Sequence, residues 1–74
     1  MDIEEIRNKV MEYAKEAVKC DKLEEYEKAY DLYLKAADKL ELLIIGNQNP
    51  YDIKIYLERI KDYVLRSKEI KVKN

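Results

Sequence analysis

The sequence has no histidine and no tryptophan, and its 74 residues include one cysteine, one glycine and one proline. A single cysteine cannot build a disulfide framework, and without histidine the usual nitrogen and sulfur ligands of a zinc site are missing. We therefore expect no metal and no other cofactor. A lone cysteine also suits a reducing compartment, so the predicted location is the cytoplasm.

Long apolar runs and an excess of positive charge are absent too. The longest uninterrupted apolar run extends from Leu42 to Ile45, far short of the roughly 20 residues that cross a bilayer. We expect no direct insertion into a membrane. The sequence has 15 Lys and Arg residues and 16 Asp and Glu residues, which gives a formal net charge of -1. Nucleic acid is not an expected partner, because such a chain does not attract a phosphate backbone.

The sequence contains no recognisable catalytic constellation. Its only serine, Ser67, falls in an apolar helical pattern, and no glycine-rich phosphate loop is present. Neighbouring carboxylates at the predicted helix starts are typical of capping. Cys20 has no histidine to activate it, so we interpret it as a structural, partly buried residue. We do not expect an enzyme.

Three segments repeat apolar residues at the spacing of one helix face. They predict helices over about residues 3–21, 25–45 and 50–70, with an interruption near residues 22–24 that has no glycine. Gly46 is expected to end the second helix in the left-handed conformation. The fold class is all-α, an antiparallel three-helix bundle whose first and third helices run parallel. A chain this short forms one domain, residues 1–74.

Each predicted helix carries more apolar surface than one inward stripe. Each of the three helices has one additional apolar stripe beside its core-facing residues. These flanks either widen the core or line grooves between helices that receive a peptide. They consist of Met11, Ala14 and Val18, then Leu57 and Val64, then Tyr30, Leu34 and Ala37.

The spacing of small, aromatic and charged residues resembles the MIT domain, the microtubule-interacting and trafficking module, over nearly the whole chain. The resemblance implies a three-helix adaptor that binds C-terminal tails of ESCRT-III-like proteins. It also implies a salt bridge between Asp21 and Arg66, which parallel first and third helices would bring to one end of the bundle. The matching positions are Ala14, Ala17, Asp21, Tyr26, Glu27, Ala29, Tyr33 and Ala36, then Tyr63, Arg66, Ser67, Ile70 and Lys71.

The family resemblance implies two peptide-binding modes. An extended, proline-containing peptide would lie between the first and third helices, and this is the mode we favour. An amphipathic helix would lie between the second and third helices, where the family's nearby acidic position falls on Lys68. The expected contacts of the first mode are Met11, Ala14, Val18, Tyr56, Arg59 and Tyr63, and those of the second are Leu57 and Val64.

The resemblance also suggests a parent protein. Similar domains stand at the N-terminus of the AAA ATPase that disassembles ESCRT-III filaments, including an archaeal relative that acts in cell division. The expected role is recruitment of that ATPase for membrane scission, cell division or protein transport. The isolated domain would be a cytoplasmic monomer that reaches a membrane through its partner.

Two other interpretations remain open. The first two helices also resemble the hairpin of a tetratricopeptide repeat, although the second helix continues past Glu41, where that repeat normally ends, and no second copy follows. Alternatively, the flanking stripes form the interface of a self-associating bundle. A monomer at all concentrations in sedimentation would exclude that last case.

Overall fold

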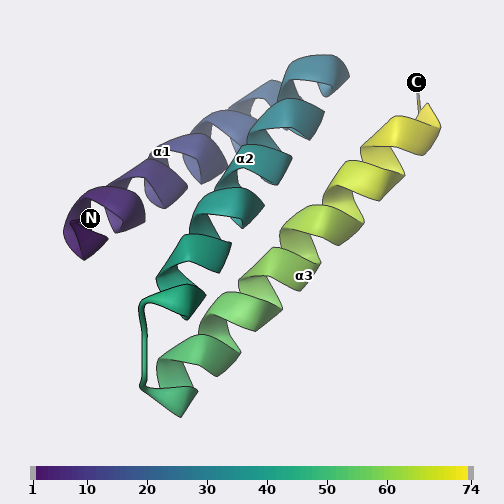
Figure 1. Ribbon diagram of the computed structural model, residues 1–74. Helices are drawn as coiled ribbons and strands as arrows, with labels where there is room; N and C mark the ends of the chain where they lie inside the picture. Colours follow the sequence, from purple (N-terminus) through teal and green to yellow (C-terminus); the bar gives the residue numbers. More distant parts are fainter. Residues whose placement is uncertain (1, 74) are drawn as a thin grey trace.

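A computed structural model describes residues 2–73 of the chain. It contains three helices, α1 (Ile3–Lys22), α2 (Tyr26–Ile45) and α3 (Pro50–Lys73), and no strand among the described residues. Figure 1 shows α2 running opposite to both neighbours, so that α1 and α3 are parallel. The predicted all-α antiparallel three-helix bundle is confirmed. Residues 1 and 74, the limits of the predicted domain, lie outside the described part.

Side-chain caps fix the beginnings of α1 and α3. The carboxylate of Asp2 accepts a hydrogen bond from the amide of Glu4 at 3.0 Å, and the side chain of Asn49 accepts one from the amide of Tyr51 at 2.9 Å. Pro50 occupies the first position of α3, where its missing N–H costs nothing.

The third helix extends slightly beyond its predicted end near Ile70. The helix continues through Lys73, because neither glycine nor proline follows Ile70 to stop it. Lys71 and Lys73 place positive charge in the last turn, where cations interact favourably with the exposed carbonyl groups.

The left-handed residue lies in the turn between α1 and α2, and not after α2 as predicted. Gly46 has φ -87° and ends α2 without a left-handed conformation, whereas Glu24, between α1 and α2, has φ 61°. The amide of Glu25 donates to the carbonyl of Cys20 at 2.8 Å, and that of Glu24 donates to Asp21 at 3.1 Å. This is a Schellman motif with glutamate at the glycine position. Gly46 needs no such geometry, since Asn47 holds the next loop by accepting from the amide of Asn49.

Glu24→Gly is expected to stabilise the protein by about 0.5 to 1 kcal/mol. Glycine removes the Cβ clash of the left-handed conformation, which stabilises the folded state. Part of this stabilisation is offset because glycine also makes the unfolded chain more flexible. Urea unfolding measures the difference. Glu27→Gly is the control, because Glu27 is exposed in the first turn of α2 and should lose stability there. Destabilisation by both changes would contradict the assigned role of Glu24.

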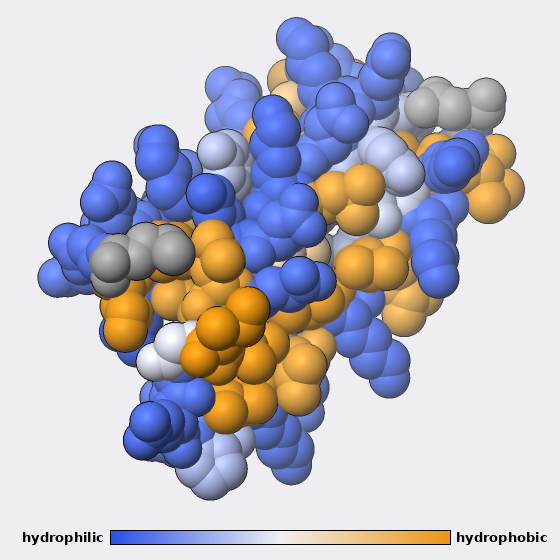
Figure 2. All heavy atoms as spheres, viewed as in Figure 1, coloured by the Kyte–Doolittle hydropathy of each residue, from blue (hydrophilic) through white to orange (hydrophobic). Residues whose placement is uncertain are grey.

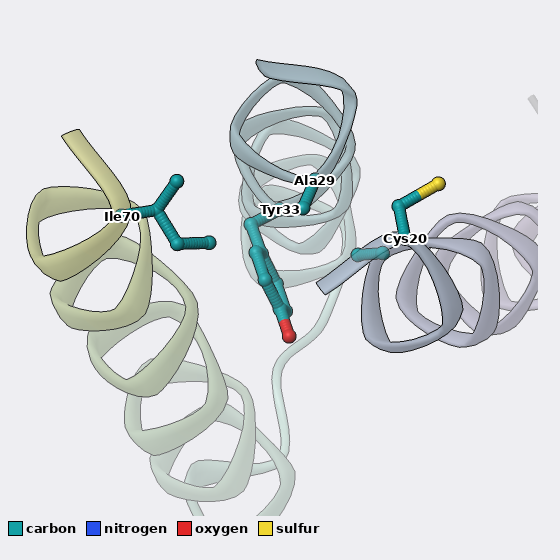
Figure 3. Close-up of a cluster of buried hydrophobic side chains, with 5 residues drawn as sticks. Cys20, Ala29, Tyr33 and Ile70 are labelled. Carbon is teal, nitrogen blue, oxygen red and sulfur yellow. The ribbon is translucent and has the colours of Figure 1, made fainter. Parts of the chain in front are cut away.

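Two apolar clusters form the core on either side of Tyr63. One contains Ala17, Cys20, Ala29, Tyr33 and Ile70, and the other contains Ile6, Val10, Leu40 and Leu43. Figure 3 shows that the labelled side chains of the first cluster come from all three helices, with Ile70 of α3 directed toward Tyr33 of α2. Ala17 and Ala29 are fully buried, and their small side chains let α1 and α2 pack closely. Tyr63 of α3 packs against both clusters.

The apolar flanks divide between core and surface. Ala37 is 4% exposed and widens the core, whereas Met11, Val18 and Leu57 are 57%, 42% and 53% exposed. A wider core is therefore the wrong interpretation for these last three residues. They remain available on the surface for contact with another molecule.

Among residues 2–73, no helix combines the length and the apolar character needed to cross a membrane.

Candidate functional site

A groove lies between α1 and α3. Both helices pack against α2, and within the described residues their own backbones do not come into contact. The opening holds a cavity of about 400 Å³. Its floor comes from Leu40 and Leu43 of α2, and its walls come from Arg7, Val10, Met11, Ala14 and Lys15 of α1 and from Tyr56, Arg59 and Tyr63 of α3.

Five of the six residues predicted for this groove line the cavity, namely Met11, Ala14, Tyr56, Arg59 and Tyr63. Val18 does not belong to its lining, although it lies one turn beyond Ala14 on the same helix. The cavity ends at Tyr63, one turn before Arg66 reaches α1. Val18 therefore lies at the closed end. Peptide contact by these residues stays a prediction.

The two residues predicted for the other groove do not line this cavity. Leu57 is exposed and Val64 is partly buried. Figure 2 shows apolar residues gathered over the end of α2 and the first turns of α3. Ile45, which is 80% exposed, and Leu57 are the large exposed aliphatic side chains of these two segments. This face offers a second apolar surface, and the exposed Lys54 and Lys61 lie beside Leu57 on the same side of α3.

Sequence reasoning missed half of the cavity lining. Val10, Leu40 and Leu43 belong to the apolar faces that form the core, and Arg7 and Lys15 resemble ordinary solvent-facing charges. The available signal was their spacing, because Arg7, Met11 and Lys15 recur every four residues and share one side of a helix.

The expected salt bridge between Asp21 and Arg66 is present. Nε of Arg66 lies 2.6 Å from Oδ2 of Asp21, and a second guanidinium nitrogen lies 2.7 Å from Oδ1. The hydroxyl of Tyr33 donates to the same carboxylate at 3.0 Å. Figure 3 shows the hydroxyl of Tyr33 directed between α1 and α3. This cluster joins all three helices and ties α1 directly to α3.

Both acidic groups of the cluster have shifted pKa values. Hydrogen bonding to Arg66 holds the pKa of Asp21 below its usual value, with a smaller contribution from Tyr33. Burial, together with the bond to Asp21, raises the pKa of Tyr33 to about 12. At neutral pH Asp21 is therefore a carboxylate that accepts hydrogen bonds, and Tyr33 is a hydroxyl that donates one.

The lowered pKa of Asp21 predicts a loss of stability in acid. Its ionised form is favoured in the folded state, so the contribution is present above the ordinary pKa of about 4 and disappears as the pH falls through the folded value. Thermal unfolding of the wild type and Asp21→Asn between neutral and strongly acidic pH measures it. The wild type should be more stable at pH 7, and the difference should shrink below about pH 4. A constant difference would contradict the ion pair as its source.

Cys20 is buried, 4% exposed, and burial raises the pKa of its thiol. Both observations agree with a structural residue and not with an activated nucleophile. Among residues 2–73, no group of three Cys, Asp or Glu side chains is placed to hold a metal ion.

Comparison with known proteins identifies the family. The pattern of the MIT (microtubule interacting and transport) domain matches residues 7–72, a range that includes the groove and the cluster around Asp21. No curated protein and no solved structure matches the chain. An MIT domain is a protein-interaction module that binds peptide partners and carries no catalytic activity of its own. The chain belongs to the MIT domain family.

Proposed function

We propose that this domain is an adaptor that binds the C-terminal tails of ESCRT-III-like proteins in the groove between α1 and α3. The observation that carries the proposal is the apolar cavity between two helices whose backbones do not touch. Met11, Tyr56 and Tyr63 present apolar surface on its walls, and Leu40 and Leu43 present it on the floor.

As the occupant of this groove we favour an extended peptide over a helix. A helix with its side chains is about 10 Å wide, whereas an extended chain is thinner and can reach the floor with alternate side chains. The bond between Asp21 and Arg66 supports this preference, because it holds α1 and α3 together at one end of the groove. A proline-containing tail suits the site, since it is already extended and loses little entropy on binding.

The wider role rests on the same proposal. Bound to such a tail, the domain would recruit an AAA ATPase to ESCRT-III-like filaments during membrane scission, cell division or protein transport. It would act in the cytoplasm and reach a membrane through its partner. The parent protein would be that ATPase, in an archaeal form.

Of the alternatives, self-association has one observation in its favour, the exposed apolar side chains of Ile45 and Leu57. Sedimentation over a wide range of concentrations tests it. A tetratricopeptide hairpin has less support, because α2 continues unbroken to Ile45 and the matched family is the MIT domain.

Fluorescence anisotropy tests the proposed function. The probe is a labelled synthetic peptide with the sequence of a proline-containing tail of an ESCRT-III-like protein from the same genome. We expect a dissociation constant on the order of micromolar to tens of micromolar, because a disordered tail must be ordered on binding. A peptide of the same composition in scrambled order is the control. Absence of binding at millimolar peptide would overturn the proposal.

A further inference from the structure

The groove between α1 and α3 has a charge of one sign. Arg7 and Lys15 of α1 and Arg59 of α3 line the cavity, and no carboxylate lines it. All three basic side chains are exposed. The whole chain has a formal net charge of -1, so the positive charge at the groove is local.

These basic side chains have no carboxylate partner within the described residues. The ion pairs found between residues 2 and 73 involve Lys9, Lys28 and Arg66. None of them includes Arg7, Lys15 or Arg59. The three cations are therefore available to an acidic ligand, and each exchanges water for a carboxylate without first breaking an internal ion pair.

The α1 wall alternates charge and apolar surface at regular intervals. Arg7, Met11 and Lys15 follow one another every four residues. With a rise of 1.5 Å per residue, the backbone positions of Arg7 and Lys15 are about 12 Å apart. An extended peptide advances about 3.3 Å per residue and directs every second side chain to the same side. Residues four positions apart in the peptide therefore span about 13 Å on one side.

We propose that the groove selects an extended peptide with two acidic residues four positions apart and an apolar residue midway between them. The acidic side chains pair with Arg7 and Lys15, and the apolar one packs on Met11. Arg59, on the opposite wall between Tyr56 and Tyr63, favours a further acidic group on the other side of the peptide. This inference rests on the proposed function, since it specifies the chemistry of the tail that the same groove binds.

The test compares three synthetic peptides that share one proline-containing tail sequence. Their two outer residues are both Glu, both Gln or both Lys, with a central Leu in each. The Glu peptide is expected to bind the wild-type domain about threefold to tenfold more tightly than the Gln peptide, because exposed charge pairs contribute modestly. The Lys peptide should bind most weakly. The differences should shrink at high salt.

A charge exchange gives the sharpest outcome. The double variant Arg7→Glu with Lys15→Glu should reverse the order, so that the Lys peptide binds more tightly than the Glu peptide. The control variant Lys35→Glu with Lys61→Glu has the same change of net charge. Both of its positions are exposed and outside the cavity lining. It should keep the wild-type order.

Two other results are informative in different ways. Equal binding of the Glu and Gln peptides to the wild type would overturn the acidic selectivity and leave the proposed function intact. The same conclusion would follow if the control variant also bound the Lys peptide more tightly than the Glu peptide. Failure of all three peptides and of the natural tail would overturn the proposed function and this inference with it.

Discussion

Arg66→Ala is expected to lower the free energy of unfolding by about 1 to 3 kcal/mol. The substitution removes two short hydrogen bonds to a carboxylate that is 12% exposed, and leaves that carboxylate with the hydroxyl of Tyr33. It also removes a direct side-chain link between α1 and α3. Urea unfolding of the two proteins, monitored by circular dichroism, measures the difference.

Two further variants separate the ion pair from other effects of truncation. Lys68→Ala, at an exposed position of the same helix, should change the stability by less than about 0.5 kcal/mol. A double-mutant cycle with Asp21→Ala should show a clear coupling energy, because the two residues share one network. A change near zero for Arg66→Ala would show that the pair is screened by solvent and does not stabilise the bundle.

Ala14→Arg is expected to weaken binding of the tail peptide by more than about tenfold, or 1.4 kcal/mol. Ala14 lines the cavity of about 400 Å³, and a long side chain at this position fills space that the peptide needs. The fold should persist, because Ala14 is only partly buried and an arginine can extend toward solvent. Anisotropy measures the binding, and circular dichroism checks the fold.

Leu57→Arg is the matched control, since it introduces the same side chain into the surface predicted for the other groove. Leu57 is 53% exposed, and binding should stay within about twofold of the wild type, a difference of about 0.4 kcal/mol. The opposite pattern, in which Leu57→Arg abolishes binding and Ala14→Arg does not, would assign the peptide to the surface between α2 and α3.

Helical spacing predicted the three helices because each carries a continuous apolar face and one loop contains both the glycine and the proline. The predicted end of α1 agrees with the observed end at Lys22, but the spacing did not place the left-handed residue that follows it. The end of α1 depends on where the chain must turn to pack α2 against Ala17, so Glu24 accepts the left-handed conformation. At the end of α3, no local signal marks a stop, and the helix continues to Lys73.

The site was predictable only in part. Met11 and Ala14 were recognisable as apolar surface beyond the needs of one core stripe. The basic character of the groove was not predictable, because residues such as Arg7 and Lys15 are common on any solvent-exposed helix face. The size of the cavity depends on the separation of α1 and α3, which is set by the buried side chains of α2. It also depends on the ion pair between Asp21 and Arg66, which closes one end. That spacing is a property of packing and is not encoded at any one position.

The most direct test of the central claim is a heteronuclear NMR titration of the labelled domain with the proline-containing tail peptide. If the groove between α1 and α3 binds the tail, the largest shift changes will fall on Met11, Ala14, Tyr56 and Tyr63, which line the cavity. Shift changes confined to Leu57, Val64 and the facing side of α2 would contradict the choice of groove. No shift changes at millimolar peptide would contradict the adaptor role itself.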